Sequence, residues 1–266
     1  MDTPLVMGIL NVTPDSFYAS SRVQGGEALV EKARAMIADG AAILDVGGCS
    51  TRPTGEPVPE NEELARLHAA LELLDRHLPD AVVSIDTYRA RVVRECVAHH
   101  NVAIINDVSG FEWDEDMAST VASLNLPYVL THSVGWAGVD VSYSSFLQDV
   151  LAALSRKMWQ LRQMGVKDVI VDPGFGFGKN VEQNYAMLAH LPEFNILEAP
   201  LLVGLSRKSM ITRLLNISPD EALVPTAALN LAALQGGADI LRVHDVKEAV
   251  QAVRLHEALV TARNKF

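Results

Sequence analysis

Acidic, amide and basic side chains recur in this sequence directly after short apolar runs that read as buried strands. They are Asn11, Asp45, Asp86, Asn106, Asp107, His132, Asp172, Ser206, Arg207, Lys208, Arg242 and His244. Carboxylates and amides bind N–H donors, whereas arginine, lysine and histidine bind anions. A polar group buried at a strand end is costly unless it finds partners or a ligand. The pattern therefore predicts one shared polar site.

Helix capping is the competing explanation, because loops that lead from a strand into a helix often close with Asp, Ser or Thr. We favour it for Asp245, which together with Glu248 three residues later resembles a capping box, and it also suits Thr87. Capping does not suit Asp45 or Asp172, since each is followed by a loop rather than by a predicted helix.

The glycine-rich segment DPGFGFGKN (172–180) matches neither common nucleotide-binding pattern. A dinucleotide fingerprint that starts at Gly174 would need glycine where Lys179 stands, and a Walker A loop would need Ser or Thr where Asn180 stands. Glycines let the backbone approach a flat ligand, and Phe177 could cover the face of a ring.

The segments GLSRKS (204–209) and RVHD (242–245) suggest an anion site, because they follow or lie in the last two predicted strands. They bring together Arg207, Lys208, Arg242 and His244, and Ser209 lies near the start of the next predicted helix. Arg52 in STRP (50–53) suits a bidentate grip on a phosphate or carboxylate. The neighbouring Cys49 lacks a clear base, so we interpret it as a packing residue.

The elements that must position these residues alternate regularly between strand and helix. Apolar β-rich runs occupy residues 5–12, 42–48, 82–87, 103–110, 128–132, 168–174, 200–206 and 239–245. Segments with helical spacing separate them, including residues 25–40, 60–78, 88–100, 146–165 and 246–264. Eight units with a mean repeat of about 33 residues predict a single (β/α)8 barrel domain over 1–266, with a doubly wound open sheet as the alternative. In a barrel the carboxyl ends of all strands meet at one rim.

Composition excludes several classes of protein. The 266 residues include 22 Lys and Arg against 33 Asp and Glu, a net charge of −11. This surplus of acid argues against binding to nucleic acid or to an anionic membrane surface. Two cysteines are too few for a disulfide scaffold, and we see neither a signal peptide nor a membrane-spanning run. We therefore expect a cytoplasmic protein that acts on small molecules.

Seven motifs, in order, resemble dihydropteroate synthase over residues 7 to about 253. They are MGILNVTPDSF (7–17), DVGGCSTRP (45–53), SIDT (84–87), IND (105–107), DPGFGFGKN (172–180), GLSRKSM (204–210) and LRVHDV (241–246). The family fold is a (β/α)8 barrel, in agreement with the strand count. The resemblance implies condensation of 6-hydroxymethyl-7,8-dihydropterin pyrophosphate with p-aminobenzoate, which gives 7,8-dihydropteroate and pyrophosphate in folate biosynthesis. It also makes the protein a sulfonamide target.

The resemblance also implies roles for individual residues. Asp86, Asn106, Asp172 and Lys208 would bind the pterin, and Asp86, Asp172 and Lys208 would be catalytic. Asn11, Thr51, Arg52, Arg242 and His244 would hold the pyrophosphate, with Mg²⁺ bound near Asn11, and Asp45 would support this site. Thr51, Pro53, Phe177, Lys208 and Ser209 would line the p-aminobenzoate site.

Other properties remain open at this stage. Residues 18–22, Cys49 and residues 131–135 differ from the family's usual pattern, so loop closure and sulfonamide sensitivity do not follow from the resemblance. The alternatives are a pterin-dependent methyltransferase acting on a corrinoid protein, and an inactive pterin-binding paralogue. Family members are commonly dimers, and the apolar segments 226–237 and 247–260 could supply a homodimer face or simply pack on the barrel.

Overall fold

Eight parallel strands form the sheet in the computed structural model, which describes residues 3–12, 22–49, 58–133 and 143–265. They are β1 (Leu5–Asn11), β2 (Ile43–Gly47), β3 (Val83–Asp86), β4 (Ile104–Asp107), β5 (Tyr128–Thr131), β6 (Val169–Asp172), β7 (Leu202–Val203) and β8 (Ile240–Val243). The spatial order is β6-β5-β4-β3-β2-β1-β8-β7. A parallel bridge between Val171 and Leu201 joins β6 to the start of β7. The sheet is therefore a nearly closed barrel, and the predicted fold class is confirmed.

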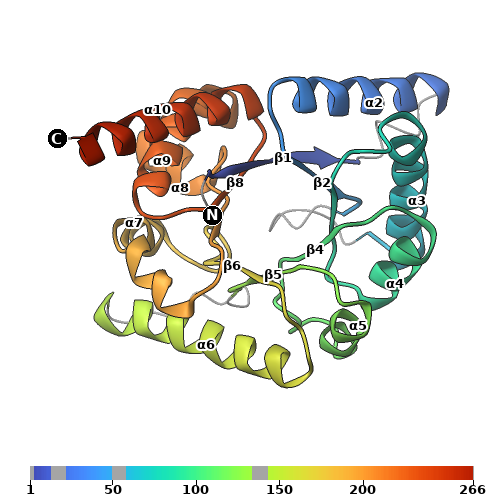
Figure 1. Ribbon diagram of the computed structural model, residues 1–266, viewed down its shortest axis with the longest axis horizontal. Helices are drawn as coiled ribbons and strands as arrows, with labels where there is room; N and C mark the ends of the chain where they lie inside the picture. Colours follow the sequence, from blue (N-terminus) through green and yellow to red (C-terminus); the bar gives the residue numbers. More distant parts are fainter. Residues whose placement is uncertain (1–2, 13–21, 50–57, 134–142, 266) are drawn as a thin grey trace.

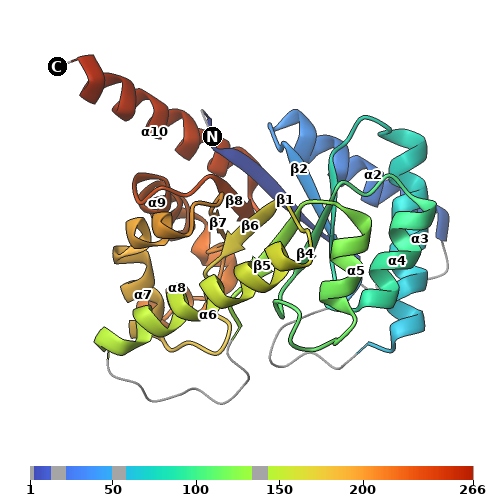
Figure 2. The same ribbon diagram turned by 60° about the horizontal axis from the view of Figure 1, so that its bottom comes forward.

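Helices surround the strands as an outer ring (Figure 1). They are α2 (Arg22–Ala38), α3 (Glu60–His77), α4 (Ala90–His99), α5 (Met117–Leu124), α6 (Tyr143–Gln163), α7 (Val181–Ala189), α8 (Ser209–Leu215), α9 (Leu223–Gln235) and α10 (Val246–Lys265), with 3₁₀ turns η1 (Leu191–Leu197) and η2 (Pro219–Ala222). Figure 2 shows α10 extending past the barrel beside the N-terminal strand. None of the helices in the described ranges has a stretch long and apolar enough to cross a membrane.

The barrel interior is closed by one apolar residue from almost every strand. These side chains are Met7, Ile43, Ile104, Val129, Ile170, Leu202 and Ile240, and all of them are buried. Side chains alternate between the two faces of a strand, so the residue two positions later points to the same interior. Those positions hold Ile9 in β1 and, in or directly after the other strands, Asp45, Asn106, Thr131, Asp172, Gly204 and Arg242. The apolar layer thus forms a floor, and the polar residues form the next layer toward the rim.

The predicted capping role of Thr87 is wrong. The helix that follows β3 begins at Ala90, and its N-cap residue Arg89 makes no side-chain cap. Thr87 instead accepts a hydrogen bond from the Arg89 backbone N–H at 3.2 Å, and Asp114 accepts from the Ala90 N–H at 2.8 Å. The helix start is therefore satisfied from a distant loop, which sequence spacing does not reveal.

Candidate active site

A pocket opens at the carboxyl ends of the strands and gathers most of the residues predicted to bind pterin. Its lining comprises Asp86, Asn106, Val108, Thr131, Asp172, Phe177, Gly204, Lys208 and Arg242. These residues come from six strands, β3 to β8, or the loops that follow them. All four predicted pterin ligands are in this set, and so are the predicted anion ligand Arg242 and the predicted p-aminobenzoate contact Phe177.

Two buried carboxylates hold the guanidinium of Arg242. Its Nε donates to Asp45 Oδ2 at 2.6 Å, and its Nη2 donates to Asp86 Oδ2 at 2.5 Å. Asp45 is fully buried and also accepts from Ser84 Oγ at 2.7 Å and from Asn106 Nδ2 at 3.0 Å. Asp45 therefore orients the predicted ligands Asn106 and Arg242. These contacts are what its predicted role as a support for the anion site requires.

Asp86 keeps one acceptor unused. Its Oδ2 is taken by Arg242, whereas its Oδ1 is buried and has no hydrogen-bond partner among the described residues. Burial raises the pKa of the Asp86 carboxyl to about 7, against the lowering effect of Arg242 and with the help of the nearby carboxylate of Asp45. A buried unpaired acceptor in a pocket indicates a ligand with an N–H or O–H donor at that point.

Asp172 and Lys208 form an opposite pair across the pocket. Asp172 Oδ1 accepts from the Gly174 backbone N–H at 2.8 Å, and burial raises the pKa of this carboxyl while Lys208 and Gly174 lower it. The Lys208 ammonium donates to the Phe175 carbonyl and lies 4.6 Å from the centre of the Phe177 ring. Burial lowers the pKa of Lys208 to about 8, although the charge of Asp172 opposes this. Lys208 therefore still carries its proton at neutral pH.

The glycine-rich loop is tied down by its own lysine. Lys179 Nζ donates to the carbonyls of His132, Gly174 and Phe177 at 3.0, 2.8 and 3.2 Å. Lys179 therefore holds the loop rather than adding a cation to the anion site, and burial lowers its pKa to about 7. Gly174 has φ +75°, and a Cβ there would lie 1.9 Å from the His132 carbonyl oxygen. The glycine requirement here comes from close packing between two loops, not from a phosphate.

The cations predicted to share the anion site separate into two groups. The guanidinium of Arg207 turns away from the pocket, because its Nε and Nη2 donate to the two carboxylate oxygens of Asp245 at 2.9 and 2.7 Å. The prediction that Arg207 joins the anion site is therefore wrong. Asp245 directly precedes α10, and its backbone carbonyl accepts from the Ala249 N–H at 3.2 Å. Both of its carboxylate oxygens bind Arg207, so its side chain also has a role that the capping interpretation did not include.

His244 stays at the rim in a defined orientation. Ser206 Oγ accepts from the His244 backbone N–H at 3.1 Å and lies 3.0 Å from its ring Nδ1. The hydroxyl of Ser206 thus contacts both the backbone and the ring of His244, and this fixes the orientation of the imidazole. An imidazole held at the rim suits contact with a phosphate oxygen, as predicted for the anion side.

The remaining predicted residues are placed only in part. Asn11 is exposed at the end of β1. The side chains of Asn11 and Asp86 flank Gly47 at the rim, because a Cβ added to Gly47 would lie 3.4 Å from Asn11 Oδ1 and 3.5 Å from Asp86 Cβ. Ser209 is exposed at the first position of α8. Thr51, Arg52 and Pro53 lie outside the described residues, and so do residues 18–21 and 134–135 of the atypical loops. Burial raises the pKa of the Cys49 thiol, which agrees with a packing role.

Asp107, which the strand-end pattern placed among the residues of the shared polar site, instead supports the loop after β4. Asp107 is fully buried; its Oδ1 accepts from Ser109 Oγ and N, and its Oδ2 from the Tyr128 hydroxyl and the Phe111 N–H, at 2.7–2.8 Å. It therefore folds the loop that carries Val108 into the pocket wall. The spacing Asp-x-Ser is typical of such a turn and was the available signal.

An ion pair neutralises a buried carboxylate on helix α3, outside the barrel. Glu63 of α3 is fully buried and forms an ion pair with Arg89, which also donates to the Val58 carbonyl at 2.8 Å. The ring of His132 is kept neutral, because burial and the charges of Lys179 and Lys157 lower its pKa to about 3. The spacing of residues in the sequence predicts neither the Glu63–Arg89 ion pair nor the neutral His132 ring.

A barrel of eight parallel strands with buried carboxylates, a lysine and an arginine converging at the carboxyl rim defines an enzyme that binds a small polar substrate. Residues 7–244 match the family described as pterin binding enzyme. The dihydropteroate synthase of Escherichia coli (strain K12) is 41% identical over 266 residues, covering 98% of this chain and 93% of that protein.

Solved structures agree with this match. Dihydropteroate synthase of Xanthomonas albilineans with 4-aminobenzoic acid superposes with a TM-score of 0.88 at 38% identity, covering 97% of this chain and 93% of that one. Dihydropteroate synthase of Yersinia pestis in a sulfonamide drug complex gives a TM-score of 0.87 at 37% identity, covering 98% and 95%. The chain belongs to the pterin binding enzyme family, and within it to the dihydropteroate synthases.

Proposed function

We propose that the rim pocket binds 6-hydroxymethyl-7,8-dihydropterin pyrophosphate and that p-aminobenzoate displaces its pyrophosphate to give 7,8-dihydropteroate. The observation that carries this assignment is the buried, unpaired Oδ1 of Asp86 beside Asn106, Asp172 and Lys208. A pterin presents an amino-pyrimidinone edge whose N–H groups need acceptors and whose oxo group and ring nitrogens need donors. The pocket supplies carboxylates for the first and an ammonium and an amide for the second.

The reaction requires charge to be separated along one bond. The amine nitrogen of p-aminobenzoate bonds to the pterin methylene carbon, the C–O bond to pyrophosphate breaks with its electron pair, and the new secondary amine loses a proton. Positive charge develops on the pterin as the leaving group departs. The carboxylates of Asp86 and Asp172 favour that charge, and Arg242 and His244 favour the departing anion.

The anion side needs a counter-ion, for which we propose Mg²⁺ near Asn11. The Asn11 Oδ1 is a hard oxygen ligand at an exposed rim position next to Asp86. Magnesium is usually held by one or two protein oxygens together with substrate phosphates and waters, so a single amide oxygen fits the ion. When bound, the ion neutralises charge on the leaving pyrophosphate. Thr51 and Arg52 complete this side in our proposal.

The p-aminobenzoate side is proposed to lie between Phe177 and the start of α8. The Phe177 ring can cover the aryl ring, while Lys208 and Ser209 face the carboxylate. Thr51 and Pro53 are the further contacts in this proposal. Lys208 lies between the two substrates, because it lines the pterin pocket and stacks over Phe177.

Product formation from the two substrates, with and without magnesium, tests the assignment. We expect pyrophosphate release only with magnesium and p-aminobenzoate, and we expect Lys208→Ala to abolish it. Lys32→Ala is the matched control, since Lys32 is exposed on α2 away from the rim. Methyl transfer without pyrophosphate release would favour the methyltransferase alternative, and pterin binding without turnover would favour an inactive paralogue. Full activity of Lys208→Ala would refute its role.

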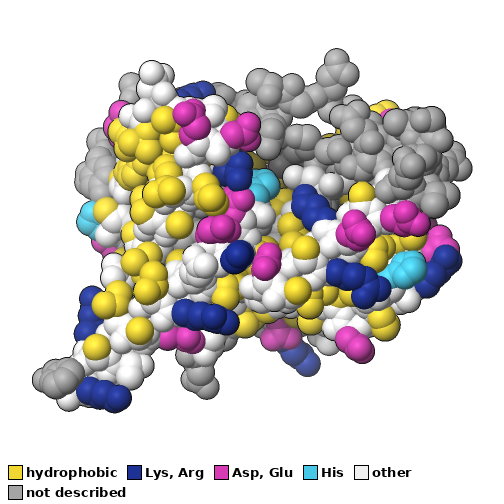
Figure 3. Space-filling model, turned by 90° about the horizontal axis from the view of Figure 1, so that it is seen from above, with side chains coloured by type: hydrophobic (Ala, Val, Ile, Leu, Met, Phe, Trp, Pro, Cys, Tyr) yellow, Lys and Arg dark blue, Asp and Glu magenta, His cyan; other side chains and the backbone are white. Residues whose placement is uncertain are grey.

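We also propose that the enzyme is a homodimer joined through its C-terminal helices. Large apolar side chains are exposed there, including Leu214, Leu215, Val224, Leu255 and Leu259. Figure 3 shows hydrophobic side chains gathered on the side from which the end of α10 projects. Val224 is 76% exposed and Leu255 59%, which favours cover by a second copy. Sedimentation of Leu255→Glu should give monomers where the unaltered chain gives dimers; an unchanged mass would contradict the proposed face.

The cytoplasm is the compartment that we propose for this enzyme. Both cysteines, Cys49 and Cys96, lie in the described residues and neither forms a disulfide, which suits a reducing environment. Fractionation of producing cells, followed by the pyrophosphate-release assay, tests this location, and activity confined to a secreted fraction would contradict it.

A further inference from the structure

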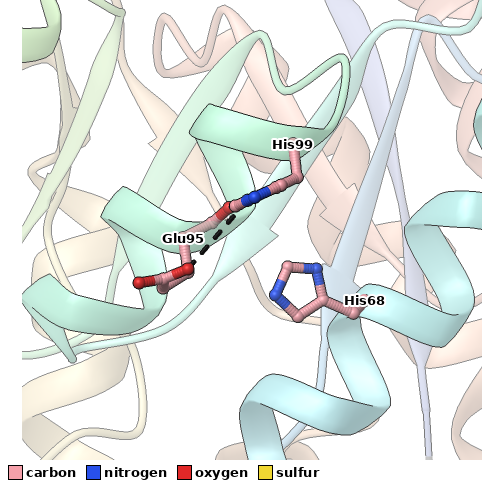
Figure 4. A group of neighbouring side chains, drawn as sticks. All are labelled: His68, Glu95 and His99. Carbon is pink, nitrogen blue, oxygen red and sulfur yellow. Dashed lines mark hydrogen bonds and ion pairs between the residues drawn. The ribbon is translucent and has the colours of Figure 1, made fainter.

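A cluster of histidines lies on the outer helices, away from the rim. His68 on α3 faces Glu95 and His99 on α4, and one ligand atom from each lies within 4.8 Å of the others. Figure 4 shows the His68 ring directed toward the Glu95–His99 pair across the gap between the two helices. Glu95 and His99 are four residues apart, so they share one face of α4. Two imidazoles and a carboxylate from two elements form a donor set for a transition metal.

A hydrogen-bond relay orients His68. Asp75 Oδ2 lies 2.8 Å from His100 Nδ1, and His100 Nε2 lies 2.8 Å from His68 Nδ1. A carboxylate only accepts, so His100 carries its hydrogen on Nδ1 and accepts at Nε2. His68 must then donate through Nδ1, which leaves its lone pair on Nε2. A carboxylate acting through a second ring on the far nitrogen is the arrangement found behind metal-bound histidines.

A hydrogen bond also fixes which ring nitrogen of His99 carries the hydrogen. Its Nδ1 lies 2.9 Å from the Glu95 backbone carbonyl oxygen, which can only accept. Nδ1 therefore carries the hydrogen, and the lone pair of His99 is on Nε2.

We propose that His68, Glu95 and His99 bind a zinc ion that joins α3 to α4. Zinc accepts imidazole and carboxylate ligands at about 2.0–2.1 Å in a tetrahedron, which places donors about 3.4 Å apart. The three side chains therefore need to draw closer together than they lie here, which the exposed His99 permits. Water would take the fourth position. This ion is separate from the magnesium proposed at the rim, and its effect is on stability.

Zinc binding by the untagged full-length chain, after treatment with a chelator, tests the proposal. A chromophoric chelator in competition with the protein should report a site that His68→Ala, His99→Ala and Glu95→Gln each weaken at least tenfold. The matched control is His77→Ala, because His77 is exposed at the end of the same α3 helix. Asp75→Asn should weaken binding about tenfold through the relay. Equal zinc affinity in these variants and in the unaltered chain would overturn the proposal.

Thermal unfolding provides a second readout. Zinc in excess of its dissociation constant should raise the Tm of the unaltered chain and of His77→Ala by several degrees. The same zinc should leave the Tm of His99→Ala unchanged, while magnesium-dependent turnover is retained in all of these variants. His99 is exposed, so this variant should fold normally. An equal rise in His99→Ala would place the zinc elsewhere and refute the site.

Discussion

Replacing Asp86 with Asn should make the enzyme more stable and less active, and both effects can be worked from the structure. In the folded protein the pKa of Asp86 is raised from 3.8 to about 7, chiefly by burial. The folded state therefore holds this proton more tightly than the unfolded chain does, so stability falls as pH rises from about 4 to 7. At pH 8 the ionised carboxyl costs about 4 kcal/mol, and at pH 5 about 2 kcal/mol.

Asn cannot ionise and escapes this cost. Urea unfolding should thus show Asp86→Asn more stable than the unaltered chain by up to about 4 kcal/mol at pH 8, with a smaller gain at pH 5. Turnover in the pyrophosphate-release assay should fall about 100-fold or more. In one orientation of the introduced amide its N–H₂ group would face an N–H donor of the pterin. In the other orientation the N–H₂ group would face Arg242, which would then keep only the carboxylate of Asp45. A variant that is less stable at pH 8, or a gain that does not change with pH, would refute the reasoning.

Three further outcomes follow from the site. Turnover should fall as pH rises through about 8, where Lys208 loses its proton, and a flat profile from pH 7 to 9.5 would argue against a charged lysine. Gly174→Ala should lose at least about 3 kcal/mol in urea unfolding, because its Cβ would overlap the His132 carbonyl, whereas Gly165→Ala, with no neighbour within 4 Å, should lose about 1 kcal/mol. Asp107→Asn should cost about 2 kcal/mol, since an amide nitrogen would face two donors; an unchanged urea midpoint would contradict this.

Local pattern was sufficient for the strands and the long helices, whereas the short helices α5 and α7 lie in segments for which we predict no helix from the sequence. The run LVMGILN at 5–11 and the other apolar runs became strands because they are bounded by polar loops and flanked by helical segments. Helix starts were less predictable, as Thr87 shows. The N–H of Ala90 is satisfied by Asp114, which lies 24 residues away, so no local signal marks that boundary.

The sequence by itself determined which residues reach the rim. Asn106, Thr131, Asp172 and Arg242 each follow an apolar strand residue by two places, and alternation along a strand places both on the interior face. The count of eight units then requires these strand ends to meet. Asn106, Asp172 and Arg242 were predictable for this reason, without knowledge of any contact. Asp86 and Lys208 follow Ser84 and Ser206 instead, and they were predictable only as residues at or just beyond a strand end.

Only the tertiary structure decided what each polar residue contacts. Arg242 pairs with Asp45, which is 197 residues away, and this contact exists because β1 lies between β2 and β8. Arg207 and Lys208 are adjacent in sequence, yet one binds Asp245 outside the pocket and the other lines it, with Arg207 at φ +57° turning the chain between them. Charge neutralisation in a buried site depends on distances between side chains, and such distances arise only when the barrel closes.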